Sequence, residues 1–223
     1  ALLLAGLLPA VASADARPEL DAALRSARSG ELDAALSAAG RVPADDPWYA
    51  DARFCVAWVH AQRGDAQAAA EAYQEVVALR PGHARAWNNL GAALDDLGRL
   101  EEALAAYDRS IAVDPLYAPA HNNRGVTLDK MGEGATAADA FRAAIEIDPA
   151  YAAPHNNLGA WYYEIGDREA AAKAWARAAE IDPKYVSPLV NRAVLEFEGD
   201  QERLAEKRLQ ALVDDGRATA DVW

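Results

Sequence analysis

Asparagine residues recur at one fixed spacing along this sequence. Three Asn pairs and then a single Asn follow one another at a step of 34 residues, counted from the second Asn of each pair: Asn88-Asn89, Asn122-Asn123, Asn156-Asn157 and Asn191. A carboxamide side chain both donates and accepts hydrogen bonds, so it can bind a group that offers a carbonyl and an N–H. Asn is also a mediocre residue for the interior of a helix. The repeated column therefore indicates a role other than local helix stability.

Residue types that carry out catalysis or hold metals do not form a recognisable site in this sequence. The single cysteine, Cys55, can form neither an intramolecular disulfide nor a cysteine zinc cluster. His121 and His155 lie one step apart. Neighbouring helices are about 8–10 Å apart, whereas zinc needs nitrogen ligands at about 2 Å, so we expect two packing residues and no shared metal.

The acidic pairs are also expected to be structural. Adjacent residues on a helix diverge, so paired carboxylates of this kind read as solvated faces: Asp95-Asp96, Glu101-Glu102 and Asp214-Asp215. The sequence contains no glycine-rich phosphate loop, nucleophile elbow or HExxH motif. We predict that the protein is not an enzyme, with no catalytic residue, no metal site and no cofactor.

The overall charge narrows the class of partner. The formal net charge is -13 at pH 7, and the sequence pI is about 4.7. Binding to nucleic acid or to an anionic membrane needs clustered Lys and Arg, so the composition argues against both. A cationic partner is compatible with this charge but is not required by it, because surplus acid is also a common solubility device.

The elements that must position the asparagines repeat at the same 34-residue step. Three residue types recur in phase: Pro47, Pro81, Pro115, Pro149 and Pro183; Gly30, Gly64, Gly98, Gly132 and Gly166; Ala35, Ala69, Ala103, Ala137 and Ala171. Self-similarity of this kind is typical of repeat architectures, in which one small unit stacks on the next.

Residues 84–117 show what one unit contains. Four residues share one face of a predicted helix at i, i+3, i+4 and i+7: Trp87, Leu90, Gly91 and Leu94. Gly98 is expected to end this helix. A second helix follows, and Pro115 stops it because proline has no amide hydrogen and clashes with the preceding turn. Each unit is therefore predicted to be helix, tight turn and helix.

A further glycine series lies inside the first helix of three units, at Gly91, Gly125 and Gly159. We expect these glycines to let the two helices of a unit approach closely.

The step and the W-x-x-L-G…G…A-x-x-x-Y…P pattern resemble the tetratricopeptide repeat. The closest match lies at Trp87, Leu90, Gly91, Gly98, Ala103, Tyr107 and Pro115. The resemblance implies an all-α fold, a right-handed α–α superhelix of about six helix-turn-helix repeats over residues 16–219. The expected repeats are 16–49, 50–83, 84–117, 118–151, 152–185 and 186–219, followed by a tail at 220–223. The first and last repeats depart from the pattern, as expected for ends that face water.

The first residues differ from the rest. Residues 1–14 are a short apolar run that ends in the small residues Ala12, Ser13 and Ala14, which fits the cleavage pattern of a secretory signal. The run is too short to span a bilayer as a helix. We interpret it as the remnant of a signal peptide and expect an exported bacterial protein, periplasmic or secreted. If the run is instead an apolar first helix, the protein is cytoplasmic.

The N-N-x-G segments also resemble those in the repeat superhelix of O-linked N-acetylglucosamine transferase. This resemblance implies that the first helix of each repeat lines a concave groove, in which an asparagine ladder holds an extended peptide by its backbone. The residues expected to contact a partner are Asn88, Asn89, Asp96, Asn122, Asn123, Asp129, Asn156, Asn157, Tyr163 and Asn191. The implied function is a non-catalytic scaffold that binds a protein or peptide, with no nucleic acid and no membrane insertion of the mature chain.

Other interpretations stay open at this point. The repeats could share Asn through common ancestry, or because Asn amides bridge adjacent helices. The chain could be the interaction region of a larger, glycosyltransferase-like enzyme. It could also be a structural protein whose repeats stack on copies of themselves.

Overall fold

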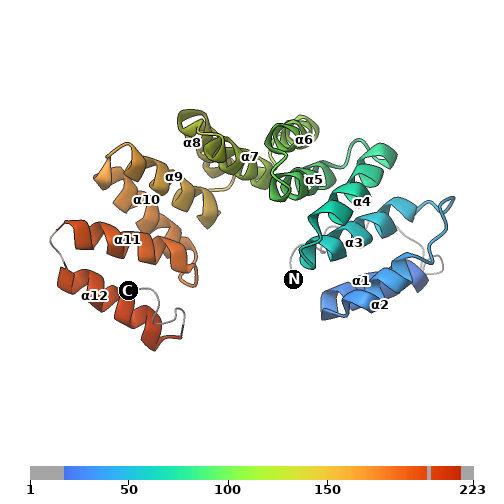
Figure 1. Cartoon of the computed structure of the whole chain (residues 1–223), viewed down its shortest axis with the longest axis horizontal. Coiled ribbons are helices and arrows are strands. Elements are labelled where there is room, and N and C mark those ends of the chain that lie inside the picture. The colour runs from blue at the N-terminus through green and yellow to red at the C-terminus, as the bar shows by residue number, and fades with distance from the viewer. Residues whose placement is uncertain (1–17, 200–201, 217–223) are drawn as a thin grey trace. The chain divides into compact units, whose positions relative to one another are not determined.

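The computed structural model describes residues 18–199 and 202–216, and these residues form twelve α-helices and no strand (Figure 1). The predicted all-α helical solenoid is confirmed. The proposed signal segment at 1–14 and the tail at 220–223 lie outside the described residues, and the boundaries between repeats stay a prediction. Within the described ranges, no helix is long and apolar enough to cross a membrane.

The chain divides into two compact units, Ala1–Pro115 and Leu116–Trp223. The first unit holds α1 (Pro18–Ser29), α2 (Leu32–Ala39), α3 (Tyr49–Gln62), α4 (Ala66–Leu79), α5 (Ala84–Asp96) and α6 (Leu100–Val113). The second holds α7 (Ala118–Lys130), α8 (Gly134–Ile147), α9 (Ala152–Glu164), α10 (Arg168–Ile181), α11 (Val186–Glu198) and α12 (Glu202–Asp214).

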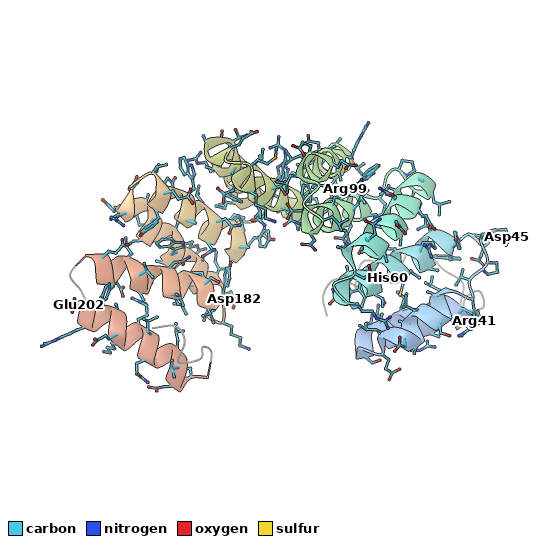
Figure 2. All side chains as sticks on the ribbon, viewed as in Figure 1. Arg41, Asp45, His60, Arg99, Asp182 and Glu202 are labelled. Atoms are coloured by element: carbon cyan, nitrogen blue, oxygen red, sulfur yellow. The ribbon has the colours of Figure 1, made fainter. Side chains whose placement is uncertain are left out.

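Within each unit, helices pack in pairs and the pairs stack in chain order. In the first unit α1 contacts α2, α3 contacts α4 and α5 contacts α6, while α2–α3 and α4–α5 contacts join successive pairs. The second unit repeats this arrangement from α7 to α12. The links between pairs are exposed, as at Asp45 before α3 and Asp182 before α11 (Figure 2).

Glycine ends the first helix of a pair, as the sequence predicted. Gly98 follows α5 with φ 72°, a left-handed backbone that residues with a Cβ rarely adopt. Its N–H donates to the carbonyl of Asp95 at 2.9 Å, and the next N–H, of Arg99, donates to Leu94 at 2.9 Å. These bonds satisfy carbonyls that the helix end leaves open. Positive φ angles recur at Gly30, Gly64, Gly132 and Gly166.

Close approach inside three of the helix pairs is confirmed at the second glycine series. A Cβ added to Gly91 would lie 2.6 Å from the ring of Tyr107, and one on Gly125 would lie 2.6 Å from Phe141. One on Gly159 would lie 2.5 Å from Trp175. The aromatic side chain of the second helix therefore rests directly on the glycine of the first.

The tryptophan position is half-buried. Trp87 packs against the core of the first unit, and its indole N–H donates to the carbonyl of Pro81 at 2.9 Å. His155 occupies the same position two repeats later, and its Nε2 lies 3.3 Å from the carbonyl of Pro149. A ring nitrogen at this position contacts the carbonyl of the proline that precedes the first helix. Both tryptophan and histidine have such a nitrogen, which explains why one can replace the other.

Candidate functional site

The asparagine column lies in the first helix of four successive helix pairs, in α5, α7, α9 and α11. The first residue of each Asn-Asn pair is buried, with exposed fractions of 5%, 5% and 9% at Asn88, Asn122 and Asn156. The second Asn of each pair and Asn191 are half-buried. The two members of a pair therefore have different surroundings, although they are adjacent on one helix.

The side chains of each pair are hydrogen-bonded to each other. The Nδ2 of Asn88 donates to Oδ1 of Asn89 at 3.1 Å. The same bond joins the pair in α7 at 3.3 Å and the pair in α9 at 3.4 Å. Each pair thus acts as one linked polar group.

In the second unit the pairs are also bonded from one repeat to the next. The Nδ2 of Asn157 donates to Oδ1 of Asn122 at 3.1 Å, and the Nδ2 of Asn191 donates to Oδ1 of Asn156 at 3.2 Å. These bonds run between α7 and α9 and between α9 and α11. They favour the interpretation in which the amides bridge adjacent helices, and they satisfy buried groups that would otherwise be costly.

In the first unit the corresponding amide reaches a different partner. The Nδ2 of Asn89 donates to the hydroxyl of Tyr73 at 3.1 Å, which links α5 to the second helix of the preceding pair. A carboxamide carries two N–H groups and two acceptor lone pairs. Among the described residues, the Asn89 amide uses one donor, to Tyr73, and one acceptor, to Asn88.

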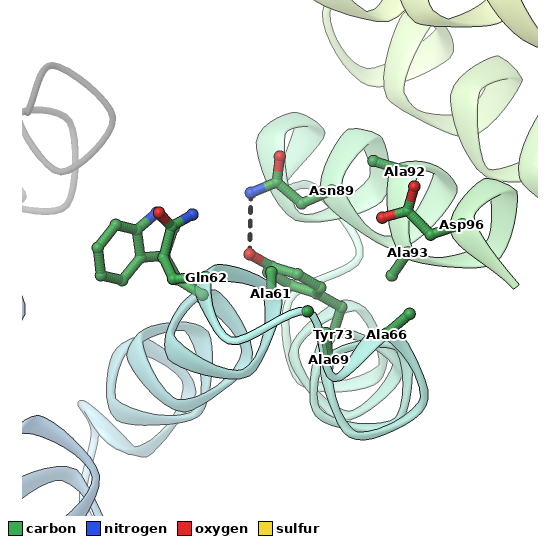
Figure 3. A pocket seen from close by; sticks show the side chains of 11 residues that line it. Ala61, Gln62, Ala66, Ala69, Tyr73, Asn89, Ala92, Ala93 and Asp96 are labelled. Atoms are coloured by element: carbon green, nitrogen blue, oxygen red, sulfur yellow. Dashed lines mark hydrogen bonds between the residues drawn. The ribbon is translucent and has the colours of Figure 1, made fainter. Parts of the chain in front are cut away.

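A pocket opens beside this bond. It has a volume of about 140 Å³ and lies where α3, α4 and α5 meet (Figure 3). Its walls include the aromatic side chains of Trp58 and Tyr73, the amide of Gln62, and Asn89 and Asp96 of α5. Two of the residues expected to contact a partner, Asn89 and Asp96, therefore line one cavity.

The second unit has a pocket at the equivalent place. Its volume is about 250 Å³, and it is lined by Ala160, Tyr163, Glu164, Trp175, Asn191 and Val194. These residues belong to α9, α10 and α11, which correspond to α3, α4 and α5 three repeats earlier. Tyr163 and Asn191, both expected to contact a partner, are brought together here.

A polar cluster stands at the edge of this second pocket. The hydroxyl of Tyr163 donates to Oε1 of Glu198 at 2.6 Å, and Arg168 donates to Oε2 of the same carboxylate at 2.7 Å. The guanidinium carbon of Arg168 lies 5.0 Å from the centre of the Tyr163 ring. Tyr163 is thus engaged by its own chain, through its hydroxyl and through its face.

The remaining expected contact residues lie outside these two pockets. Asp129 is exposed near the end of α7. Asn123 is half-buried, and its Oδ1 accepts from Asn122.

Burial favours the neutral forms of two side chains in the first unit, Cys55 and His83. Burial raises the pKa of the Cys55 thiol to about 11, and burial, followed by the charge of Arg80, lowers the pKa of His83. The Nδ1 of His83 accepts from the N–H of Ala86 at 3.2 Å and so caps α5. Among the described residues, no group of three or more His, Cys, Asp or Glu could hold a metal ion.

Sequence models of the tetratricopeptide repeat match this chain at residues 20–84, 57–118, 88–152 and 122–186. The chain belongs to the tetratricopeptide repeat family. Tetratricopeptide proteins are generally scaffolds for protein–protein interaction, and their fold is generally non-catalytic. No curated protein sequence matches the chain.

Solved tetratricopeptide and related structures resemble it along much of its length. A crystal structure of MamA is 27% identical, with a TM-score of 0.64, covering 73% of this chain and 95% of that one. A thermophilic tetratricopeptide protein of Thermus thermophilus is 25% identical, with a TM-score of 0.66 and coverage of 80% and 97%. The pilF protein of Pseudomonas aeruginosa is 19% identical, with a TM-score of 0.78 and coverage of 92% and 93%, and at this identity it supports the fold alone.

Several residues of these tetratricopeptide pockets were not expected from the sequence. Trp58, Gln62 and Tyr73 line the first pocket, and Arg168 and Glu198 form the cluster beside the second. Trp58 and Gln62 lie one step before Ala92 and Asp96. Extending the groove positions back by one repeat would therefore have found them, although that repeat has no Asn pair to draw attention to it.

Proposed function

We propose that this protein is a non-catalytic scaffold that holds an extended segment of a partner protein in the concave groove lined by the first helices of its repeats. One observation carries the proposal: two pockets recur at equivalent places, three repeats apart, and each has a half-buried Asn of the column in its wall. Family membership supports a protein as the partner, because these repeats generally mediate protein–protein contacts.

The chemistry of the column supports binding through the backbone of the partner. Since Asn89 uses one donor and one acceptor among the described residues, an N–H and a lone pair are left for a peptide group. Binding of a partner by its backbone is also the mode implied by the resemblance of the N-N-x-G segments to the superhelix of O-linked N-acetylglucosamine transferase. The second residue of each pair is the one proposed to make this contact, and the buried first residue holds it in place.

The cellular site is part of the same proposal. If residues 1–14 are a signal remnant, the partner is met outside the cytoplasm, in the periplasm or beyond the cell.

The proposal is tested by selecting peptides from an unbiased displayed library on the purified chain. Each selected peptide is then measured against two variants that place the same bulky side chain on the first unit. Ala92→Trp fills the wall of the first pocket, whereas Ala105→Trp adds the ring at an exposed position of α6. We expect affinity to fall at least about tenfold for Ala92→Trp and to stay near the parent value for Ala105→Trp.

The fold of both variants is checked by circular dichroism and thermal unfolding. A library that yields no binder, or binders equally affected by the two variants, would contradict the proposal. Selected peptides that match segments of the chain's own sequence, together with a mass in solution that rises with protein concentration, would favour a self-assembling structural protein instead.

A further inference from the structure

The two equivalent pockets differ in one respect. An acidic side chain lies beside each of them, and among the described residues only the second unit also places a basic side chain against it. In the second unit, Arg168 binds the carboxylate of Glu198 at 2.7 Å. Its guanidinium also lies over the ring of Tyr163, with 5.0 Å between the guanidinium carbon and the ring centre. This cluster therefore shows how a guanidinium is held at the edge of such a pocket.

The first unit presents the same backbone positions. Arg168 is the first residue of α10, and Ala66 is the first residue of α4. Both follow an aspartate that caps the helix, since Asp167 accepts from the N–H of Ala170 and Asp65 from that of Ala68. The two helices therefore start in the same register, and Ala66 stands where Arg168 stands in the later repeat.

The acidic partner is retained in the first unit. Glu198 is the last residue of α11, and Asp96 is the last residue of α5. Asp96 lines the first pocket together with Ala66, and Figure 3 shows the two on the same side of it. No ion pair or hydrogen bond joins the Asp96 side chain to any described residue. The first unit therefore keeps the carboxylate, as Asp96. It has the methyl group of Ala66 at the position where Arg168 neutralises Glu198 in the second unit.

The pocket between them is suited to the rest of a long basic side chain. Trp58 and Tyr73 provide aromatic surface, and Gln62 provides a carboxamide acceptor. Arginine and lysine bury their aliphatic stems against apolar surface while the charged end reaches a polar group. A guanidinium is also attracted to aromatic faces and binds carboxylates through paired N–H groups.

We propose that the first-unit pocket takes a basic side chain, preferentially arginine, from the bound partner segment, and that Asp96 binds its charged end as Glu198 binds Arg168. The inference rests on the proposed function and specifies the chemistry of one subsite. The net charge of -13 acts in the same direction, because it attracts cationic segments and raises their association rate.

The test uses peptides selected on the parent chain in the library experiment above. The first readout is composition: one position of the pocket-dependent peptides should be enriched in Arg or Lys. A representative peptide is then synthesised with Arg or with citrulline at that position, since citrulline keeps the shape of arginine and removes its charge. Binding of both peptides is measured to the parent, Asp96→Asn and Glu101→Gln, the last removing another exposed acid, on α6.

We expect Asp96→Asn to weaken the Arg peptide about tenfold or more, and Glu101→Gln to change its affinity less than about twofold. The citrulline peptide should bind weakly to the parent and lose little more on Asp96→Asn, so that the double-mutant cycle assigns the coupling to this pair. The Asp96→Asn effect should also shrink as salt is added.

A variant that fills the first pocket with an arginine of its own chain provides an independent test. Ala66→Arg restores the residue found in the later repeat and should pair with Asp96, so it should reduce binding of both peptides about tenfold. Ala78→Arg adds the same charge at an exposed site on the same helix and should have little effect. Loss of binding in Ala78→Arg to the same degree would contradict the proposal.

The basic subsite and the scaffold function would be contradicted by different results. Selected peptides that depend on the pocket but show no basic preference, or that bind Asp96→Asn as tightly as the parent, would overturn the basic subsite and leave the scaffold function standing. Absence of any pocket-dependent peptide would overturn the scaffold function itself.

Discussion

Asn156 makes three kinds of hydrogen bond at once. Its Nδ2 donates to Asn157 at 3.4 Å, its Oδ1 accepts from Asn191 at 3.2 Å, and its backbone carbonyl accepts from the indole of Trp175 at 3.1 Å. Asn156 is 9% exposed, so these hydrogen bonds satisfy polar groups that water reaches poorly. One residue thereby joins α9 to α10 and to α11.

We expect Asn156→Ala to lower the free energy of unfolding by about 1–3 kcal/mol, because a buried side chain loses its hydrogen bonds to Asn157 and Asn191. Denaturant unfolding of Asn156→Ala, Asn191→Ala and the double variant measures the coupling between the two amides. Additive single effects would contradict the direct bond.

Cys55 is expected to be chemically inert in the folded protein. It is 0% exposed, and burial raises the pKa of its thiol to about 11, whereas only the thiolate reacts readily. A thiol-specific chromogenic reagent at pH 8 should therefore label it only as fast as the first unit opens. Labelling in denaturant provides the control for a single accessible thiol, and immediate labelling without denaturant would show that the prediction is wrong.

For single residues, the sequence was a better guide to which positions recur than to the surroundings of their side chains. The 34-residue step identified the Asn pairs, and Asp96 does line a pocket. The burial of Asn88 and the bond from Asn89 to Tyr73 depend on the distance between helices of different repeats, which a single-helix projection does not contain. Arg168 was missed for the same reason, since its partner Glu198 is 30 residues away in sequence.

The start of α5 shows how an element depends on one imidazole. His83 accepts from the N–H of Ala86 and stacks on Phe54 with a centroid separation of 5.1 Å. The contact with Ala86 requires an unprotonated Nδ1, so it is made by the neutral ring. Burial, and then the positive charge of Arg80, lowers its pKa, while Asp51 raises it and Arg85 lowers it to smaller extents.

This arrangement predicts a pH effect with a definite sign. The unfolded chain takes up a proton on this histidine near its ordinary pKa of 6.5, while the folded chain does so only at lower pH. Stability therefore falls as pH drops below about 6.5. We expect His83→Asn, which preserves a capping side chain, to show a smaller loss of unfolding free energy between pH 7.5 and pH 5.5. An identical loss in parent and variant would argue against His83 as a source.

Helix pairing was the part of the fold most accessible from sequence. Each turn glycine adopts the positive φ that its position required, and α6 ends at Val113, two residues before Pro115. Trp87 is half-buried on the face that the apolar period predicted, and the period itself does not say how much of that face its neighbours cover.

For the whole molecule, stacked repeats imply that damage stays local. Within each unit a helix packs mainly on its pair partner and on the next pair, so stability approximates a sum over neighbours. Gly125→Leu places a side chain where a Cβ alone would lie 2.6 Å from Phe141 and 3.1 Å from the carbonyl of Ala137. We expect it to cost about 1–3 kcal/mol through overpacking.

Hydrogen exchange locates this effect. Faster exchange should appear in α7, α8 and α9, while α3 and α4 keep the protection of the parent. Gly82→Leu is the matched control, because nothing lies within 4 Å of a Cβ built there. A uniform loss of protection through both units would mean that the repeats unfold as one cooperative body.

The first residue of α4 is Ala66, whereas the equivalent residue of α10 is Arg168. This difference has a consequence for how a repeat protein could change the partner segments that it binds. Ala66 and Arg168 occupy the same surface position, and neither is part of the buried core. Exchanging one for the other opens or closes a subsite without disturbing the packing between helices. A chain of this kind could therefore change what it recognises one repeat at a time, by releasing or covering acidic groups that the scaffold already carries.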